Sequence, residues 1–425
     1  MEEERRKARR IHITREQWAW ALYDWGNSAF ATVVMAGFYP LFFKQYWAAG
    51  MAVTESTFWL GAGNAVAAVL VVAGAPVLGA MADQGGGRKR YLGRFLVLGC
   101  LATAGLFLVP EGAWGWALLL FALASIGFAG GNVFYDALLP QVADERRVDF
   151  VSALGYGLGY LGGGLLFAGC VGTTLHPEWL GVGDAGIVVR LSFLLVAGWW
   201  FLFALPLFLR VHEPLPPPRP VLQVARAGFR QLAETFRHIR SLRPVMLFLG
   251  AYWCYIDGVD TVIRMAVDYG LSLGLDSGDL ITALLVTQFV GFPAAVAFGL
   301  LARYTGPKGG IYIALGVYIL IVLWAGQMST ASEFYVLAVA VGLVQGGIQS
   351  LSRSFYSRLI PTDKAAEFFG FYNMLGKFAA VLGPLLVGLT GHLTGDPRAG
   401  ILSILVLLVA GALLLLPVRV SHGGE

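Results

Sequence analysis

Charged residues are scarce in this sequence. Asp, Glu, Lys and Arg make up only 13% of its 425 residues, while 57% are hydrophobic. A soluble domain carries about 25% charged residues, so this chain has too little polar surface to face water on all sides. Cysteine is scarce as well, and Cys100, Cys170 and Cys254 all lie within apolar runs. Such an odd set predicts neither a disulfide framework nor a thiolate metal site.

Clusters of histidine are also missing. A membrane-embedded enzyme needs a metal cluster or a nucleophile paired with a base, but the six histidines are scattered and form no H-x-x-x-H pair. The sequence therefore predicts no catalytic residue, no metal site and no cofactor, and we expect a protein that is not an enzyme. The start "MEEERRKARR" leads into an apolar stretch too long for a signal peptide, so we expect the first helix to stay in the mature protein.

Long apolar runs are what the chain has in abundance. A helix needs about 20 apolar residues to cross the hydrocarbon core of a bilayer, and about twelve runs of this kind occur, separated by short polar breaks. The predicted fold class is therefore an all-α integral membrane protein, with the lipid bilayer as its surroundings. We expect the helices near residues 18–47, 57–82, 91–109, 114–140, 150–171, 187–211, 244–273, 279–302, 310–327, 334–360, 368–393 and 400–418.

Lys and Arg gather in alternate connections between these runs. They occur before the first run, in "GRKR" after the second, in "ERR" after the fourth, in the central segment, and after the eighth and tenth runs. The positive-inside rule then places both termini in the cytoplasm. This topology signal accounts for the formal charge of +4, so no nucleic-acid partner is expected.

The centre of the chain breaks the apolar pattern. "VHEPLPPPRPV" is rich in proline, and "QVARAGFRQLAETFRHIRSLRP" predicts an amphipathic basic helix on the membrane surface. The predicted domains are a six-helix bundle over 1–211, a cytoplasmic linker over 212–243 and a second bundle over 244–425. We expect the linker to act as a tether, with a regulatory or lipid-sensing role as the alternative.

The two bundles contain an internal repeat. The stretch that begins at Gly79 aligns with the stretch at Gly299, an offset of 220, and Gly155 aligns with Gly376 at an offset of 221. Two matches in equivalent places indicate duplicated six-helix units, an arrangement in which the substrate site lies between the halves. In the fifth span, Gly155, Gly159 and Gly163 have the four-residue spacing that lets helices approach closely.

The loop that contains the first repeat match resembles a known signature. "GAMADQGGGRKRYLG" is similar to the loop of the major facilitator superfamily that latches the cytoplasmic side, and its counterpart has Arg303 in place of the acidic residue. The resemblance implies a twelve-helix fold, transport by alternating access and an asymmetric latch. The residues that it assigns to this cytoplasmic gate loop are Gly79, Asp83, Arg88 and Lys89.

Three further motifs point to one branch of that superfamily. "YDWGNSAFATVV", "GNVFYDALLP" and "YWCYIDGVDTVI" resemble the branch of the fungal vacuolar amino-acid effluxers linked to autophagy and their bacterial relatives. This resemblance implies an amino acid as cargo.

Polar side chains concentrate on the first, fourth, seventh and tenth spans, which are equivalent if each half is a pair of three-helix repeats. Their spacing of three and four residues places them on one face of each helix. We expect these faces, with part of the eleventh span, to line a shared substrate and proton pathway formed by Asp24, Asn27, Asn132, Asp136, Asp257, Asp260, Gln345, Gln349, Arg353, Asn373 and Lys377. The third, sixth, ninth and twelfth spans have almost no charge and are expected to face lipid.

A charge inside the bilayer is costly and needs a partner. Arg353 can form a static or gating ion pair with Asp24 or Asp136, or it can contact the substrate, and the sequence leaves both open. Asp257 and Asp260 are expected in the cavity, as proton carriers or as ligands for a cationic group.

Arg264 and Asp268 are expected at an outer gate. Lys377 can neutralise a carboxylate or bind an anion.

The predicted function is secondary active transport of a small polar metabolite, most simply proton-coupled movement of an amino acid. The alternatives are a sugar transporter, a flippase or exporter of lipids or amphiphiles, and a sensor that transports nothing. Polar stripes favour a small hydrophilic solute, because a flippase should have a more apolar cavity. We expect a monomer in a bacterial cytoplasmic membrane, since this fold carries its own pathway.

Overall fold

The computed structural model describes residues 13–214, 220–237, 242–272 and 277–419. Some side chains inside these ranges, among them Arg264, Asp268 and Lys377, lie outside the described set. Within these ranges the chain is helical, with no strand.

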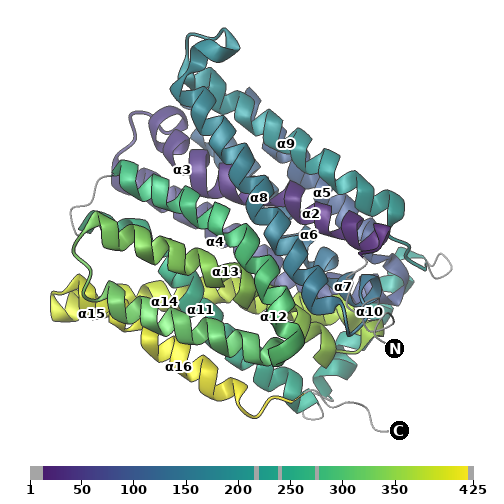
Figure 1. The fold of residues 1–425 in the computed structure, drawn as a ribbon. Helices are drawn as coiled ribbons and strands as arrows, with labels where there is room; N and C mark the ends of the chain where they lie inside the picture. Colours follow the sequence, from purple (N-terminus) through teal and green to yellow (C-terminus); the bar gives the residue numbers. More distant parts are fainter. Residues whose placement is uncertain (1–12, 215–219, 238–241, 273–276, 420–425) are drawn as a thin grey trace, which may run out of the picture.

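The first half forms one bundle (Figure 1). Its first helix, α2, continues through π-helical turns and the short α3, so that Arg15–Trp47 form one long helical segment. The other helices of this half are α4 (Val53–Met81), α5 (Arg88–Gly105), α6 (Trp114–Ala137), α7 (Leu139–Val142), α8 (Val148–Leu175) and α9 (Ala185–Arg210).

The second half of the chain follows the linker helix α10 (Val221–Arg237). Its helices are α11 (Arg243–Ser272), α12 (Ser277–Ala325), α13 (Ala331–Leu359), α14 (Ala365–Thr394), α15 (Pro397–Leu402) and α16 (Ile404–Leu415). Figure 1 shows α12 doubling back on itself, at Gly306, whose φ of 68° is a conformation that favours glycine. The two helices predicted over 279–302 and 310–327 are therefore the two arms of α12.

Within the described ranges, ten helical segments are long and apolar enough to cross a membrane. One of them, Thr282–Ala325, contains the reversal in α12, and α14 contributes a shorter apolar stretch, Leu382–Thr394. The all-α membrane fold is confirmed by these helices, while the count of twelve crossings stays a prediction.

At the first helix, the observed start differs from the predicted one because a cap extends the helix. The first helix begins at Arg15, three residues before the predicted Trp18, because Thr14 and Gln17 form a capping box. The Thr14 hydroxyl accepts the Gln17 N–H at 3.2 Å, and the Gln17 side chain accepts the Thr14 N–H at 3.1 Å.

The surface of the bundle is apolar along its flanks. Leu101, Leu202, Leu320 and Leu413 are all more than half exposed, and they lie on the four spans predicted to face lipid. Exposed apolar side chains on this scale mark a surface that contacts another apolar phase, which here is the bilayer core.

Glycines on α8 let it approach α2 closely, as their spacing predicts. A Cβ on Gly155 would lie 2.8 Å from Asp24 Oδ2, and one on Gly163 would lie 2.6 Å from Thr32 Oγ1. Between them, Gly159 faces the Ser28 hydroxyl. Larger residues at these positions would separate the helices, so the glycine stripe fixes the place of the polar face of α2.

The bundle has two distinct ends. Figure 1 shows α2 beginning and α16 ending at the end where α7 and α10 lie. We call this the linker end. The reversal in α12 lies at the same end, so the basic loops of the sequence gather there (Figure 1).

Candidate functional site

A buried arginine from the second half reaches into the first half. The Arg353 side chain, on α13, is 2% exposed, and its Nη1 lies 3.0 Å from Asp136 Oδ1 and 3.4 Å from Asp24 Oδ2. Its other donors reach Ser152 on α8, because Nε donates to the hydroxyl and Nη2 to the carbonyl oxygen, both at 2.9 Å. We call Arg353, Asp24 and Asp136 the central charge cluster.

Aromatic rings surround this guanidinium. Its carbon lies 4.3 Å from the ring centre of Tyr156, 4.8 Å from that of Trp20 and 5.5 Å from that of Tyr135. A cation over such rings gains about 0.5–2 kcal/mol per contact, most when water is excluded. The rings therefore offset part of the cost of burying the charge.

Each carboxylate of the central charge cluster has a second partner. Tyr135 donates its hydroxyl to Asp24 at 2.9 Å, and the ring of Tyr135 is itself held by stacking on Trp20 at 4.4 Å. Asn373, on α14 of the second half, donates to Asp136 Oδ2 at 3.0 Å. Two elements of the second half therefore hold the same pair of carboxylates in the first.

The charges in the cluster do not balance among the described residues. Two carboxylates face one guanidinium, so full ionisation would leave one negative charge in a buried place. An uncompensated buried charge is expensive. Among the described side chains, one carboxylate charge of the cluster therefore has no cation to balance it.

The structure brings several of the predicted pathway residues next to this cluster. Asn27 on α2 donates to Asn132 on α6 at 2.7 Å, and Tyr160 on α8 donates to Gln349 on α13 at 3.0 Å. Asn132, Gln345, Gln349, Asn373 and Asp260 are half-buried, whereas Asn27 and the cluster itself are buried. The described residues of the predicted set therefore divide into a buried part and a half-buried part.

Asp257 lies in a different environment. It is fully buried, and its Oδ1 accepts the Gly383 N–H of α14 at 2.9 Å and the Thr261 hydroxyl at 3.4 Å. Its Oδ2 has no hydrogen-bond partner among the described residues. Asp257 thus joins α11 to α14 inside the second half, next to Pro384, and it takes no part in the central charge cluster.

Three predicted residues cannot be compared with this geometry. Lys377, Arg264 and Asp268 lie outside the residues whose side chains the structure describes.

A second set of contacts closes the linker end. The Asp83 carboxylate accepts the backbone N–H groups of Ala366 at 3.2 Å and of Glu367 at 2.9 Å, in the first turn of α14. An anion at a helix N-terminus satisfies free N–H groups and the helix dipole. Arg88 pairs with the same carboxylate at 2.9 Å and donates to the carbonyl oxygen of Thr362 at 2.9 Å. We call Asp83, Arg88 and the first turn of α14 the linker-end gate.

Close backbone packing and an ion pair strengthen this closure. Gly79 lies against the carbonyl group of Ala366 with no room for a side chain, so the α4 and α14 backbones touch. Arg358 on α13 pairs with Asp149 on α8 at 2.5 Å. The two halves are therefore in direct contact at the linker end.

Lys89 has a different role from its predicted neighbours in the loop. Its ammonium group donates to the carbonyl oxygens of Phe208 at 2.9 Å and Val211 at 2.6 Å, at the end of α9. Its backbone N–H donates to Glu213 at 3.0 Å. These contacts of Lys89 stay within the first half and the beginning of the linker.

Several residues of the site were not predicted. Ser152 holds Arg353, yet in the sequence it looks like an ordinary member of an apolar helix. Glu367 and Gln231 meet near the linker-end gate, and nothing in their spacing indicates it. Asp149 lies on α8, which carries no predicted pathway residue, and Arg358 follows Arg353 by five residues on α13. The spacing along a single helix therefore does not pair them.

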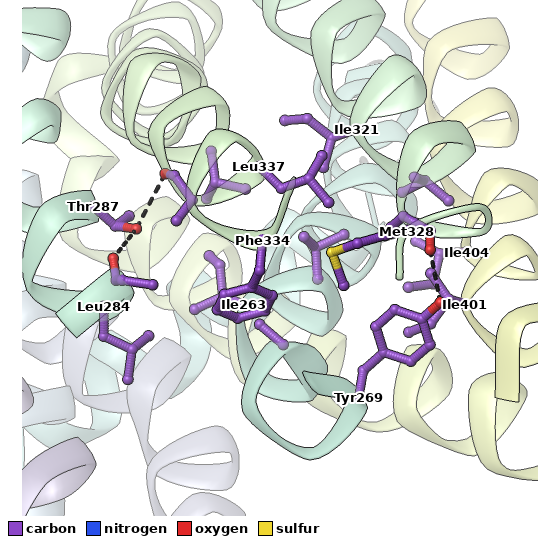
Figure 2. A pocket seen from close by; sticks show the side chains of 17 residues that line it. Ile263, Tyr269, Leu284, Thr287, Ile321, Met328, Phe334, Leu337, Ile401 and Ile404 are labelled. Atoms are coloured by element: carbon purple, nitrogen blue, oxygen red, sulfur yellow. Dashed lines mark hydrogen bonds between the residues drawn. The ribbon is translucent and has the colours of Figure 1, made fainter. Parts of the chain in front are cut away.

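An apolar cavity lies inside the second half, away from these polar sites (Figure 2). Its walls include Ile263, Leu337 and Ile401. Its few polar groups are bonded to the backbone, since Tyr269 donates to the carbonyl oxygen of Ala325 at 2.6 Å and Thr287 donates to that of Ala338 at 3.1 Å. Among the described lining residues, the cavity therefore has no free polar group that would orient a polar solute.

Comparison with known proteins decides the family. Residues 46–425 match the model of a family described as "Vacuole effluxer Atg22 like". This chain belongs to the Atg22-like family.

Two relatives and one solved structure show how far the likeness extends. An uncharacterised MFS-type transporter of Bacillus subtilis (strain 168), YxiO, is 40% identical over 410 residues, covering 95% of this chain and 94% of the relative. Autophagy-related protein 22 of Eremothecium gossypii is 26% identical over 375 residues, covering 79% and 72%. The major facilitator transporter FucP, in its outward conformation, has a TM-score of 0.70 at 12% identity, covering 95% and 98%.

These findings confirm the predicted family and the predicted fold. The Atg22-like chain is a multi-pass membrane protein with the fold of major facilitator transporters, and its relative YxiO is named as an MFS-type transporter. A small molecule is therefore its substrate.

Proposed function

We propose that this Atg22-like protein moves an amino acid across a bacterial cytoplasmic membrane by proton-coupled alternating access, as a monomer. The observation that carries the proposal is the central charge cluster, in which Arg353 of one half binds Asp24 and Asp136 of the other. An ion pair that joins two bundles must break when the bundles separate, so its strength depends on which side of the pathway is open.

The position of the hydrogen bonds and ion pairs between the two halves supports a state that is closed at the linker end. The hydrogen bonds between the halves run from Tyr160 and Gln349, through the central charge cluster, to the linker-end gate in the described part of the chain. Tyr160 is 12 residues into α8, which is about 18 Å at 1.5 Å per residue. If the linker end is cytoplasmic, as its basic loops predict, the described state faces outward.

An amino acid has the two charges that this site can bind. Its ammonium group can replace the guanidinium at Asp24 or Asp136, and its carboxylate can pair with Arg353. Binding would then exchange one ion pair for two others and loosen the contact between the halves. The half-buried amides of Asn132, Gln345 and Gln349 lie on the same helices and supply hydrogen bonds beside the cluster.

Proton coupling follows from the charge count of the cluster. One proton on Asp24 or Asp136 leaves a neutral site with Arg353, and a cationic ammonium group does the same. Proton and substrate therefore compete for one negative charge, which couples their movements. Asp257 and Asp260 remain candidates for a second proton site, because both lie on α11 and Asp257 is buried.

The test is uptake of a panel of labelled amino acids into proteoliposomes, with and without an imposed proton gradient. Asp24→Asn and Asp136→Asn are compared with the native chain in accumulation and in counterflow, which exchanges substrate without net proton movement. We expect both variants to lose gradient-driven accumulation and to keep counterflow. Asp363→Asn, an exposed carboxylate at the linker end, is the matched control and should behave as the native chain does.

Two results would contradict the proposal. If the folded native protein moves no amino acid, the proposed cargo is wrong, and sugars and lipids should be tested as substrates. If both variants still accumulate substrate with the gradient, the proton does not bind at the central charge cluster.

A further inference from the structure

The linker helix α10 lies across the ends of two membrane-spanning helices. Gly228 packs on Met81, the last residue of α4, at a distance that leaves no space for a side chain, since a Cβ there would be 2.8–3.0 Å from Met81 atoms. The 29 residues of α4 span about 44 Å, which exceeds the roughly 30 Å of hydrocarbon. α4 is therefore long enough for its end, and α10 with it, to reach the depth of the lipid headgroups.

One face of α10 is bound to the bundle. Val224, Gly228, Gln231 and Thr235 are buried and follow one another at intervals of four, three and four residues. Gln231 receives a hydrogen bond from Gln84 of the first half and donates one to Glu367 of the second. This inner face of α10 thus bridges the two halves beside the linker-end gate.

The opposite face of α10 is amphipathic in its own right. Leu222 is 81% exposed and Phe229 is 57% exposed, and their separation of seven residues places them on one side. Arg226, Arg230 and Arg237 are exposed on the neighbouring side. Apolar residues beside a row of arginines are typical of helices that lie in a membrane interface.

The charge of α10 favours an anionic partner. The helix has three arginines and one glutamate, a net charge of +2. Glu234 pairs with Arg230 at 3.0 Å, but the Arg230 side chain is 82% exposed in that pair, and such surface pairs contribute little. Arg230 can therefore turn to a stronger anion.

We propose that the outer face of α10 binds the headgroups of anionic phospholipids and thereby stabilises the state that is closed at the linker end. Arg226, Arg230 and Arg237 bind the phosphates, while Leu222 and Phe229 enter the upper part of the acyl chains. Because Gln231 on the same helix bridges the halves, lipid that holds α10 in place also holds Gln84 and Glu367 together. The cargo plays no part in this inference, so it stands or falls separately from the proposed function.

A bilayer fits this face better than a soluble protein partner does. The apolar and basic stripes are adjacent on a helix that can reach headgroup depth, so one side of the helix meets hydrocarbon and the next meets phosphate. Each basic residue near an anionic surface strengthens binding roughly fivefold. Because α10 has three such arginines, its binding should depend strongly on the anionic lipid content of the membrane. This content is therefore the quantity to vary.

The experiment is hydrogen–deuterium exchange of the full chain in nanodiscs of phosphatidylcholine alone or mixed with phosphatidylglycerol. We expect phosphatidylglycerol to slow amide exchange at least tenfold over Val221–Arg237 and in the first turn of α14. The variant Arg226→Gln, Arg230→Gln, Arg237→Gln changes only exposed positions, so it should fold normally, exchange as the native chain does in phosphatidylcholine and lose the effect of phosphatidylglycerol.

Two controls separate the steps of the proposal. Gln231→Ala should keep the protection of α10 by phosphatidylglycerol and lose the protection of the first turn of α14. Soluble glycerophosphate added to phosphatidylcholine nanodiscs should protect neither segment. Equal exchange of native α10 in both bilayers overturns the proposal and leaves a protein or a second copy of this chain as the partner of the outer face. Protection by glycerophosphate, or by phosphatidylglycerol in the triple arginine variant, overturns it as well.

Discussion

Replacing Arg353 by glutamine should open the linker end. The protein partners of the guanidinium, Asp24, Asp136 and Ser152, all belong to the first half. The loss therefore falls on the contact between the halves rather than on the stability of either one. Removing one partner of a buried ion pair costs about 3–5 kcal/mol, and the lower figure already changes an equilibrium constant by a factor of roughly 150. The closed state, which dominates in the native chain, should then coexist with a measurable population of the open state.

The assay is the distance between spin labels on the two halves at the linker end. Arg146→Cys and Asp363→Cys supply one exposed label position on each half. The chain also carries Cys254→Ala, which removes the half-buried native cysteine. Cys100 and Cys170 can stay, because both are buried. The native chain should give one short distance, and Arg353→Gln should add a longer one. Adding Asp136→Asn to Arg353→Gln should restore part of the short distance, because it removes one of the two carboxylates left without their cation.

Arg303→Gln is the matched control, since Arg303 is an exposed arginine near the reversal in α12. It should leave the native distance unchanged. Identical distance distributions for Arg353→Gln and Arg303→Gln would refute the reasoning, because the central charge cluster would then contribute nothing to closure.

Two further substitutions test the packing and the gate. Gly155→Ala places a Cβ 2.8 Å from Asp24 Oδ2 and 3.0 Å from the Tyr135 hydroxyl and should destabilise the fold by about 1–3 kcal/mol, measured as a lower thermal unfolding temperature. Gly169→Ala, where nothing lies within 4 Å, should not lower it, and equal effects of the two changes would contradict the close approach of α2 and α8. Asp83→Asn removes a charge worth about 0.3–2 kcal/mol at the N-terminus of α14 and should lengthen the spin-label distance less than Arg353→Gln does. Glu55→Gln, at an exposed position, should not change it, and a normal distance in Asp83→Asn would show that the linker-end gate is held by other contacts.

The fold was largely predictable from the sequence because a bilayer restricts the choices. Long apolar runs have to form helices there, since every backbone group needs a partner within the chain. The glycine spacing of α8 also predicted the close approach of another helix, which the structure shows to be α2. The helix starts at Arg15 and Ala331 were missed by a few residues because capping boxes at Thr14 and Thr330 extend those helices into polar sequence.

The candidate site was predictable only in part. Spacing on one helix placed Asp24 and Arg353 on polar faces, and their depth suggested an ion pair. It could not show that Ser152 would hold the guanidinium or that Asp257 would face Gly383 instead of the cluster. Such pairings depend on how helices rotate about their axes when they pack, which the period of a single helix does not reveal.

The most direct test of proton-coupled alternating access is the pH inside proteoliposomes while substrate moves. A pH-sensitive dye in the lumen reports proton movement when an amino acid that the native chain transports is added outside. The account predicts a pH change with the native chain and none with Asp24→Asn or Asp136→Asn, although both still exchange substrate. Transport by the native chain with no change in pH would contradict it.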